Sequence, residues 1–131
     1  MAKRLISLFK WWWPVIAWMA AIMTVSSIPR ALLPETGIQH LDKIAHAVEY
    51  AILGILLMRA LSRSNLNMSF TKISAIAIIS SLCYAILDEW HQQFIPGRAT
   101  DILDLTADFI GVNVGVLLYK RKNANAKSET I

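Results

Sequence analysis

The chain has 131 residues, of which 56% are hydrophobic and 17% are charged. This length leaves room for one domain, and the composition is too apolar for an ordinary soluble fold of that size. The formal net charge of +4 must therefore be interpreted for a chain that lies in a membrane.

The apolar residues form four continuous runs with short polar connections between them. The runs extend from Trp12 to Ile28, from Ile44 to Leu61, from Ile73 to Phe94 and from Ile102 to Tyr119. Each is close to the ~20 residues with which a helix crosses a bilayer. None alternates between apolar and polar residues with a period of two, which argues against a β-barrel. The sequence therefore predicts an all-α integral membrane bundle of four transmembrane helices.

The connections and the ends define the expected organisation. The first run follows basic residues, as a signal peptide would, but it carries three adjacent tryptophans and no clear small-x-small cleavage site, so we interpret it as an uncleaved anchor. Pro96 and Gly97 mark a tight turn before the fourth run. We expect a transmembrane domain at 1–119, with its motif-bearing part at 42–118, and a basic disordered cytoplasmic tail at 120–131.

The basic residues predict how the helices are oriented. With a cytoplasmic amino terminus, ten of the thirteen Lys and Arg residues lie on the inner side, and only Arg30, Lys43 and Arg98 lie outside. This is the direction of the positive-inside rule. We therefore expect both termini in the cytoplasm of a multi-pass protein of the inner or plasma membrane. The net positive charge then needs no nucleic-acid partner, because the inner segments would face membrane lipids.

The acidic residues have the opposite distribution. Eight of the nine map to the outer half, and only Glu129 lies inside. Acids contribute little to orientation, so this asymmetry needs its own cause. The eight are Glu35, Asp42, Glu49, Asp88, Glu89, Asp101, Asp104 and Asp108.

Helical periodicity predicts that many of these acids share one site. On the fourth run Asp101, Asp104, Asp108, Gly111 and Gly115 fall within an arc of about 80°. The second run has a stripe of His46, Glu49, Tyr50, Leu53 and Leu57, and the third has one of Ser81, Tyr84, Asp88, His91 and Gln92, with Glu89 to the side. Three polar stripes, ionisable only at their outer ends, predict an outward-facing cleft in the bundle.

Simpler roles compete with a ligand site at several positions. Asp101, Asp104 and Asp42 could cap helix starts, and His46 could be a packed histidine bonded to a carboxylate. Arg98 could bind an anionic ligand, but we favour a bridge to neighbouring carboxylates. The two glycines of the fourth run are best explained by close helix packing.

The same residues form motifs that resemble the VanZ-like family. The motifs are Asp42-Lys43-x-x-His46-x-x-x-Tyr50-x-x-Leu53-Gly54, Asp88-Glu89-x-x-Gln92-x-Phe94-x-Pro96-Gly97-Arg98 and Asp104-x-x-x-Asp108-x-x-Gly111-x-x-x-Gly115. In many relatives asparagine stands at the position of Asp108, so the resemblance implies that a charge there is not essential. It also implies a small multi-helix membrane protein, whose name-giving member gives low-level resistance to teicoplanin, a lipid-tailed glycopeptide. It implies no known reaction.

Two functional hypotheses follow, and they use one set of residues. The first is a binding protein of the cell envelope, whose cleft takes a lipid headgroup, a lipid-linked cell-wall precursor or a lipoglycopeptide. The second is a membrane-embedded enzyme acting on a lipid headgroup, in which carboxylates act as acid or base or bind Mg²⁺ or Ca²⁺. No cofactor is otherwise expected. The candidate ligand-binding residues are His46, Glu49, Tyr50, Asp88, Glu89, Gln92, Arg98, Asp104 and Asp108.

Two further alternatives stay open, and the first of them, a transporter, ranks last. A proton-linked transporter would need ionisable groups across the whole membrane, and the inner half of the runs has no such relay. A purely structural role for the polar residues also stays open, because ion-pair networks can simply hold helices together.

Overall fold

The computed structural model describes residues 2–32, 41–64 and 67–128, with side chains described between residues 8 and 125 of these ranges. This part of the chain forms four α-helices and one short 3₁₀ helix, with no strand. The helices are α1 (Ala2–Ser26), α2 (Leu41–Arg63), α3 (Phe70–Gln92) and α4 (Ile102–Ser128), and η1 (Arg30–Leu32) follows α1. The predicted all-α fold with four helices is confirmed.

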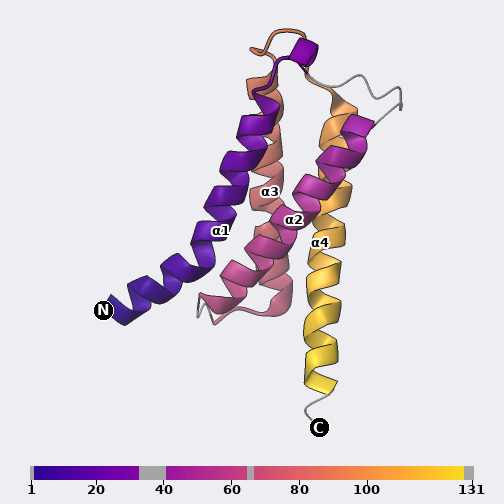
Figure 1. Ribbon diagram of the computed structural model, residues 1–131. Helices are drawn as coiled ribbons and strands as arrows, with labels where there is room; N and C mark the ends of the chain where they lie inside the picture. The colour runs from indigo at the N-terminus through magenta and orange to yellow at the C-terminus, as the bar shows by residue number, and fades with distance from the viewer. Residues whose placement is uncertain (1, 33–40, 65–66, 129–131) are drawn as a thin grey trace.

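The four helices run alternately up and down, so the start of α1 and the end of α4 lie at the same end of the bundle (Figure 1). Each helix contains an apolar stretch long enough to cross a bilayer, of 19, 23, 23 and 24 residues in chain order. Large apolar side chains face outward along the bundle, among them Ile16, Ile79 and Leu117, each more than half exposed. In a membrane these side chains contact acyl chains rather than water.

α4 extends beyond the end predicted for the transmembrane domain. The helix continues through Tyr119 to Ser128, so residues 120–128 are helical where a disordered tail was expected. This stretch has no glycine or proline to stop the helix, and it is rich in Lys, Arg and Ala, which are good helix formers. The change from apolar to polar residues after Tyr119 therefore does not mark the end of the helix.

α2 and α4 form the closest helix pair, and glycines make that approach possible. A Cβ atom at Gly111 would lie 2.2 Å from the carbonyl oxygen of Ala47, and one at Gly115 would lie 2.1 Å from that of Ala51. No side chain fits in such gaps. The structure thus confirms the packing role predicted for the glycine pair, with α2 as the partner.

α1 packs on the bundle through the buried apolar side chains of Val15 and Ile22, and side-chain hydrogen bonds add to this contact. The indole Nε1 of Trp18 donates to the carbonyl of Glu49 at 2.9 Å, and the hydroxyl of Tyr84 donates to the carbonyl of Met19 at 2.5 Å. Pro14 lies inside α1, and the segment that precedes it swings away from the other helices (Figure 1), as expected where proline interrupts the hydrogen-bond ladder.

Candidate functional site

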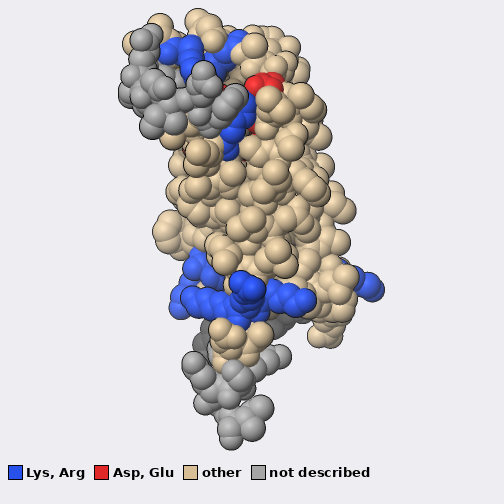
Figure 2. Space-filling model, turned by 90° about the vertical axis from the view of Figure 1, so that its right-hand side faces the viewer, with Lys and Arg blue, Asp and Glu red and all other residues tan. Residues whose placement is uncertain are grey.

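The bundle has two chemically different ends. The acidic end is the one where α1 and α3 finish and α2 and α4 begin, and the basic end is the opposite one. On the face shown in Figure 2, Lys and Arg form a band across the basic end, and a second blue group with a small red patch beside it lies at the acidic end. Several acids at the acidic end are buried, and the described ones there are Asp42, Glu49, Asp88, Glu89, Asp101, Asp104 and Asp108. Glu35 and Glu129 lie outside the described residues.

Lys43 is the cation that holds the outermost acids together. Its Nζ lies 3.2 Å from Asp42 Oδ2, 2.5 Å from Asp101 Oδ2 and 2.6 Å from Asp104 Oδ1. The hydrogen bond from Lys43 is the main reason that the pKa of the Asp101 carboxyl lies below its ordinary value. Asp101 also accepts a hydrogen bond from the backbone N–H of Leu103 at 2.8 Å, which confirms its predicted cap role.

Arg98 does not form the bridge to carboxylates that the sequence favoured. Its Nε and terminal nitrogens donate to the carbonyls of Ile28 (3.2 Å) and Val25 (3.4 Å) and to the amide oxygen of Gln92 (3.5 Å). No carboxylate in the described part of the chain lies within ion-pair distance of it. The prediction was wrong because Arg98 lies beside the end of α1, where the carbonyls of Val25 and, two residues past the helix, Ile28 accept its hydrogen bonds.

His46 and Asp108 form a buried pair between α2 and α4. His46 Nδ1 lies 3.0 Å from Asp108 Oδ1, and the two side chains are 8% and 0% exposed. This confirms the interpretation of His46 as a histidine bonded to a neighbouring carboxylate. Tyr50, one turn further along α2, is fully buried, and its ring faces that of Tyr84 at a centroid distance of 6.4 Å.

Asp88 connects α3 to the end of α1. Its Oδ2 accepts hydrogen bonds from the hydroxyl of Ser26 at 2.9 Å and from Gln92 Nε2 at 3.3 Å. Asp88, Gln92 and Ser26 are 0%, 2% and 4% exposed. Ser26 was not among the predicted site residues, because it stands at the end of an otherwise apolar run and nothing in its spacing links it to α3.

Glu89 lies in the cluster rather than beside it. Its Oε2 accepts a hydrogen bond from the backbone N–H of Asp101 at 2.8 Å, at the start of α4, and the residue is only 7% exposed. One possible ligand atom each from His46, Glu89 and Asp104 lie within 4.8 Å of one another. By contrast, Glu49 is only half-buried, and its carboxylate makes no hydrogen bond or ion pair within the described chain.

Several polar atoms in this cluster are buried without a hydrogen-bond partner among the described residues. They are Tyr50 Oη, Ser81 Oγ, Asp88 Oδ1, Glu89 Oε1 and Asp108 Oδ2, contributed by α2, α3 and α4. Buried polar atoms in proteins almost always have partners, and one that lacks them within a membrane is especially unfavourable. These five atoms are the polar groups of the three helices that contacts among the described residues leave unpaired, and three of them are carboxylate oxygens, those of Asp88, Glu89 and Asp108.

An open hollow of about 290 Å³ lies at the acidic end, above the most deeply buried acids. It is lined by Arg30, Asp42, Gln92, Gly97, Arg98, Ala99, Thr100, Asp101 and Asp104. The predicted cleft was expected to open onto the acids of all three stripes, whereas the carboxylates of Asp88 and Asp108 are fully buried below it. The hollow is therefore lined by Asp42, Asp101 and Asp104, the outermost acids, and Asp88 and Asp108 lie underneath.

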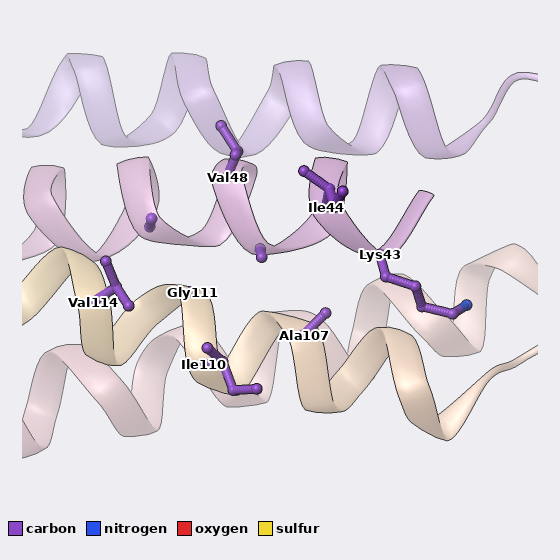
Figure 3. Close-up of a pocket in the computed structure, with 9 residues that line it drawn as sticks. Lys43, Ile44, Val48, Ala107, Ile110, Gly111 and Val114 are labelled. Carbon is purple, nitrogen blue, oxygen red and sulfur yellow. The ribbon is translucent and has the colours of Figure 1, made fainter. Parts of the chain in front are cut away.

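A second surface feature runs from the acidic end down the side of the bundle. Between α2 and α4 lies an apolar groove of about 390 Å³, flanked by Ile44 and Val48 on one helix and by Ile110 and Val114 on the other (Figure 3). Its floor consists of Ala47, Ala51, Ala107 and Gly111, the small residues of the close helix pair. Lys43 lies at the end of the groove that is nearest the acidic end of the bundle, and its Nζ is directed away from the groove toward Asp104.

The fold and the site define a class of protein: a multi-pass helical membrane protein with a buried acidic cluster at one end of the bundle. The chain belongs to the VanZ/LLP1 family, whose sequence model matches residues 2–123. This match confirms the resemblance found in the motifs and extends it over α1. Neither the curated proteins nor the solved structures gave a significant match.

Proposed function

We propose that the acidic end binds the polar headgroup of an amphiphilic ligand on the outer side of the cell membrane. The ligand is a membrane lipid, a lipid-linked cell-wall precursor or a lipoglycopeptide, and the role is envelope homeostasis or tolerance of such antibiotics. The observation that carries the proposal is the set of five buried polar atoms without partners, drawn from three helices. A ligand that brought hydrogen-bond donors would supply what the three carboxylate oxygens lack, and its acceptors could pair with the Tyr50 and Ser81 hydroxyls.

The charge balance of the acidic end favours a ligand with amino or hydroxyl donors. Seven described carboxylates face only three permanent cations there, Arg30, Lys43 and Arg98. Lys43 is shared by three of the acids. The remaining negative charge produces a field that attracts cationic groups, while Arg30 and Arg98 at the rim offer contacts to a phosphate or carboxylate of the same headgroup.

The apolar groove supports an amphiphilic rather than a fully soluble ligand. It begins next to Lys43 and continues along α2 and α4, where the surrounding bilayer would lie. A headgroup seated in the hollow would leave its acyl or prenyl chain beside this groove. Apolar contact along a shallow, fixed surface would then add to the polar contacts of the headgroup.

The proposal is tested by measuring ligand affinity with purified protein and three probes: phosphatidylethanolamine, a lipid-linked cell-wall precursor and teicoplanin. For the true ligand, Glu89→Gln and Asp88→Asn are each expected to weaken binding about tenfold, because each removes one charge-assisted hydrogen bond. Lys72→Gln, at the basic end on α3, is the matched control and leaves affinity unchanged. If both acid variants bind every probe as tightly as the natural protein does, the proposal fails.

A second candidate function is catalysis on a headgroup with a bound divalent cation. The proximity of His46, Glu89 and Asp104 favours it, and so does the unpartnered Oε1 of Glu89. Against it, Lys43 already lies 2.6 Å from Asp104 and would repel a cation there. Elemental analysis of the purified protein decides between binding and metal-dependent catalysis. A stoichiometric metal that is lost in His46→Ala supports catalysis. A metal-free protein that still binds ligand excludes the metal-dependent catalytic function.

A further inference from the structure

A separate pocket lies at the basic end, among α1, α2 and α4. It has a volume of about 400 Å³ and shares no residue with the acidic cluster or the apolar groove. Its lining combines cationic, aromatic and aliphatic side chains: Arg59, Arg63, Lys122, Trp11, Tyr119, Ile55, Leu56, Leu118 and Asn123. The polar groups lie toward the end of the bundle and the aliphatic ones deeper in the span, as the order of residues along α2 and α4 requires.

Three cations converge on this pocket from two helices. Arg59 and Arg63 are one turn apart on α2 and so share a face, and Lys122 faces them from α4. All ion pairs found in the described chain are at the acidic end. No described carboxylate is therefore available to neutralise these three charges.

The Trp11 ring holds both arginines through cation–π contacts. The guanidinium carbons of Arg59 and Arg63 lie 5.6 and 5.2 Å from the ring centre, and Lys10 Nζ lies 5.4 Å from it. A cation–π contact satisfies none of the guanidinium N–H donors. The Nε of Arg59 is buried and has no hydrogen-bond partner in the described part of the chain. This donor and the two further cations of the pocket lack an acceptor within the described chain, and an anion is the acceptor that matches their charge.

We propose that this pocket binds the phosphate of an anionic phospholipid, whose acyl chain follows Ile55, Leu56 and Leu118 into the bilayer. Arginine pairs suit phosphate because their planar donor sets match its oxygens. A lipid fits better than a soluble anion because the deeper lining is aliphatic and Leu118 is half exposed on the membrane-facing surface. Tryptophan and tyrosine at the pocket are residue types that favour the headgroup level. The site is independent of the function proposed for the acidic end.

The test is native mass spectrometry of the full-length protein with phosphatidylglycerol and with phosphatidylcholine of identical acyl chains. The natural protein is expected to prefer phosphatidylglycerol about tenfold or more, and Arg63→Gln to lower that affinity about fivefold, the effect of one basic charge near an anionic headgroup. Arg63 is exposed, so this variant should fold. Lys122→Gln provides a second variant on α4 with the same expected loss, and Arg63→Lys should retain most of the preference.

Two matched controls separate a built pocket from general positive charge. Lys72 on α3 and Arg121 on α4 are also at the basic end but do not line the pocket, so Lys72→Gln and Arg121→Gln should leave the preference unchanged. Equal losses in the pocket variants and in these controls would overturn the proposal. Displacement of phosphatidylglycerol by a similar concentration of inorganic phosphate would show that the pocket takes a soluble anion, and would overturn the assignment to a lipid.

Discussion

Gly115→Ala is expected to destabilise the protein by about 3 kcal/mol, because the new methyl group would collide with the backbone of α2. The added Cβ would lie 2.1 Å from the carbonyl oxygen of Ala51 and 2.9 Å from its carbonyl carbon. Neither atom belongs to a flexible side chain, so the whole of α2 must move away. In a membrane, where no hydrophobic effect pulls helices together, a lost contact of this kind has few compensations.

A graded set of variants on the same helix pair makes this prediction sharp. Gly111→Ala should resemble Gly115→Ala, and Gly54→Ala should be milder, because its Cβ would lie 2.8 Å from the carbonyl oxygen of Val112. Asn113→Ala, between the two glycines on α4, is the control and should change stability little. The measurement is unfolding in SDS followed by circular dichroism. If Gly115→Ala gained the ~1 kcal/mol expected from alanine's helix propensity alone, the packing account would be wrong.

His46→Ala is the second variant for which we expect a large effect, about 3 kcal/mol of lost stability. The Asp108 side chain is fully buried, and His46 Nδ1 at 3.0 Å is the hydrogen-bond partner found for its Oδ1, while its Oδ2 has none in the described chain. Removing the imidazole would leave both carboxylate oxygens of Asp108 buried without a donor. The same SDS unfolding experiment measures the loss.

The double variant His46→Ala/Asp108→Asn distinguishes this reason from loss of packing volume. An amide at 108 carries no charge, so the penalty of an unpartnered carboxylate disappears, and at least half of the stability lost in His46→Ala should return. Asp108→Asn alone should be mild, because the amide oxygen can still accept from His46. Equal destabilisation of the single histidine variant and the double variant would show that the cavity, and not the buried charge, is responsible.

The fold was predictable from sequence because lipid imposes simple rules. Four apolar runs of membrane-spanning length could only become helices, and the small residues at 111 and 115 correctly predicted close packing. The helix ends were less predictable. α4 passes beyond Tyr119 because its basic, alanine-containing continuation is still a good helix former, even though it is no longer apolar.

The site was predictable where it depends on helical phase and unpredictable where it depends on how helices meet. His46, Asp88 and Asp108 are buried as their stripes predicted. Glu89 was placed to the side of its stripe, but it faces the start of α4, a contact that no single-helix projection reveals. The cation that pairs with the acids was also unpredictable. Lys43 forms these ion pairs and Arg98 does not. Which of the two reaches the carboxylates depends on the three-dimensional geometry of the turn, which the sequence does not reveal.

The acidic end is proposed to be an outward-facing ligand site, and labelling of single cysteines in intact cells tests its orientation most directly. In a Cys83→Ala background, Thr100→Cys places a thiol in the exposed lining of the hollow, and Asn67→Cys places one at the basic end. A membrane-impermeant maleimide should label Thr100→Cys in intact cells and Asn67→Cys only after lysis. Labelling of Asn67→Cys alone in intact cells would place the acidic cluster in the cytoplasm and contradict the account.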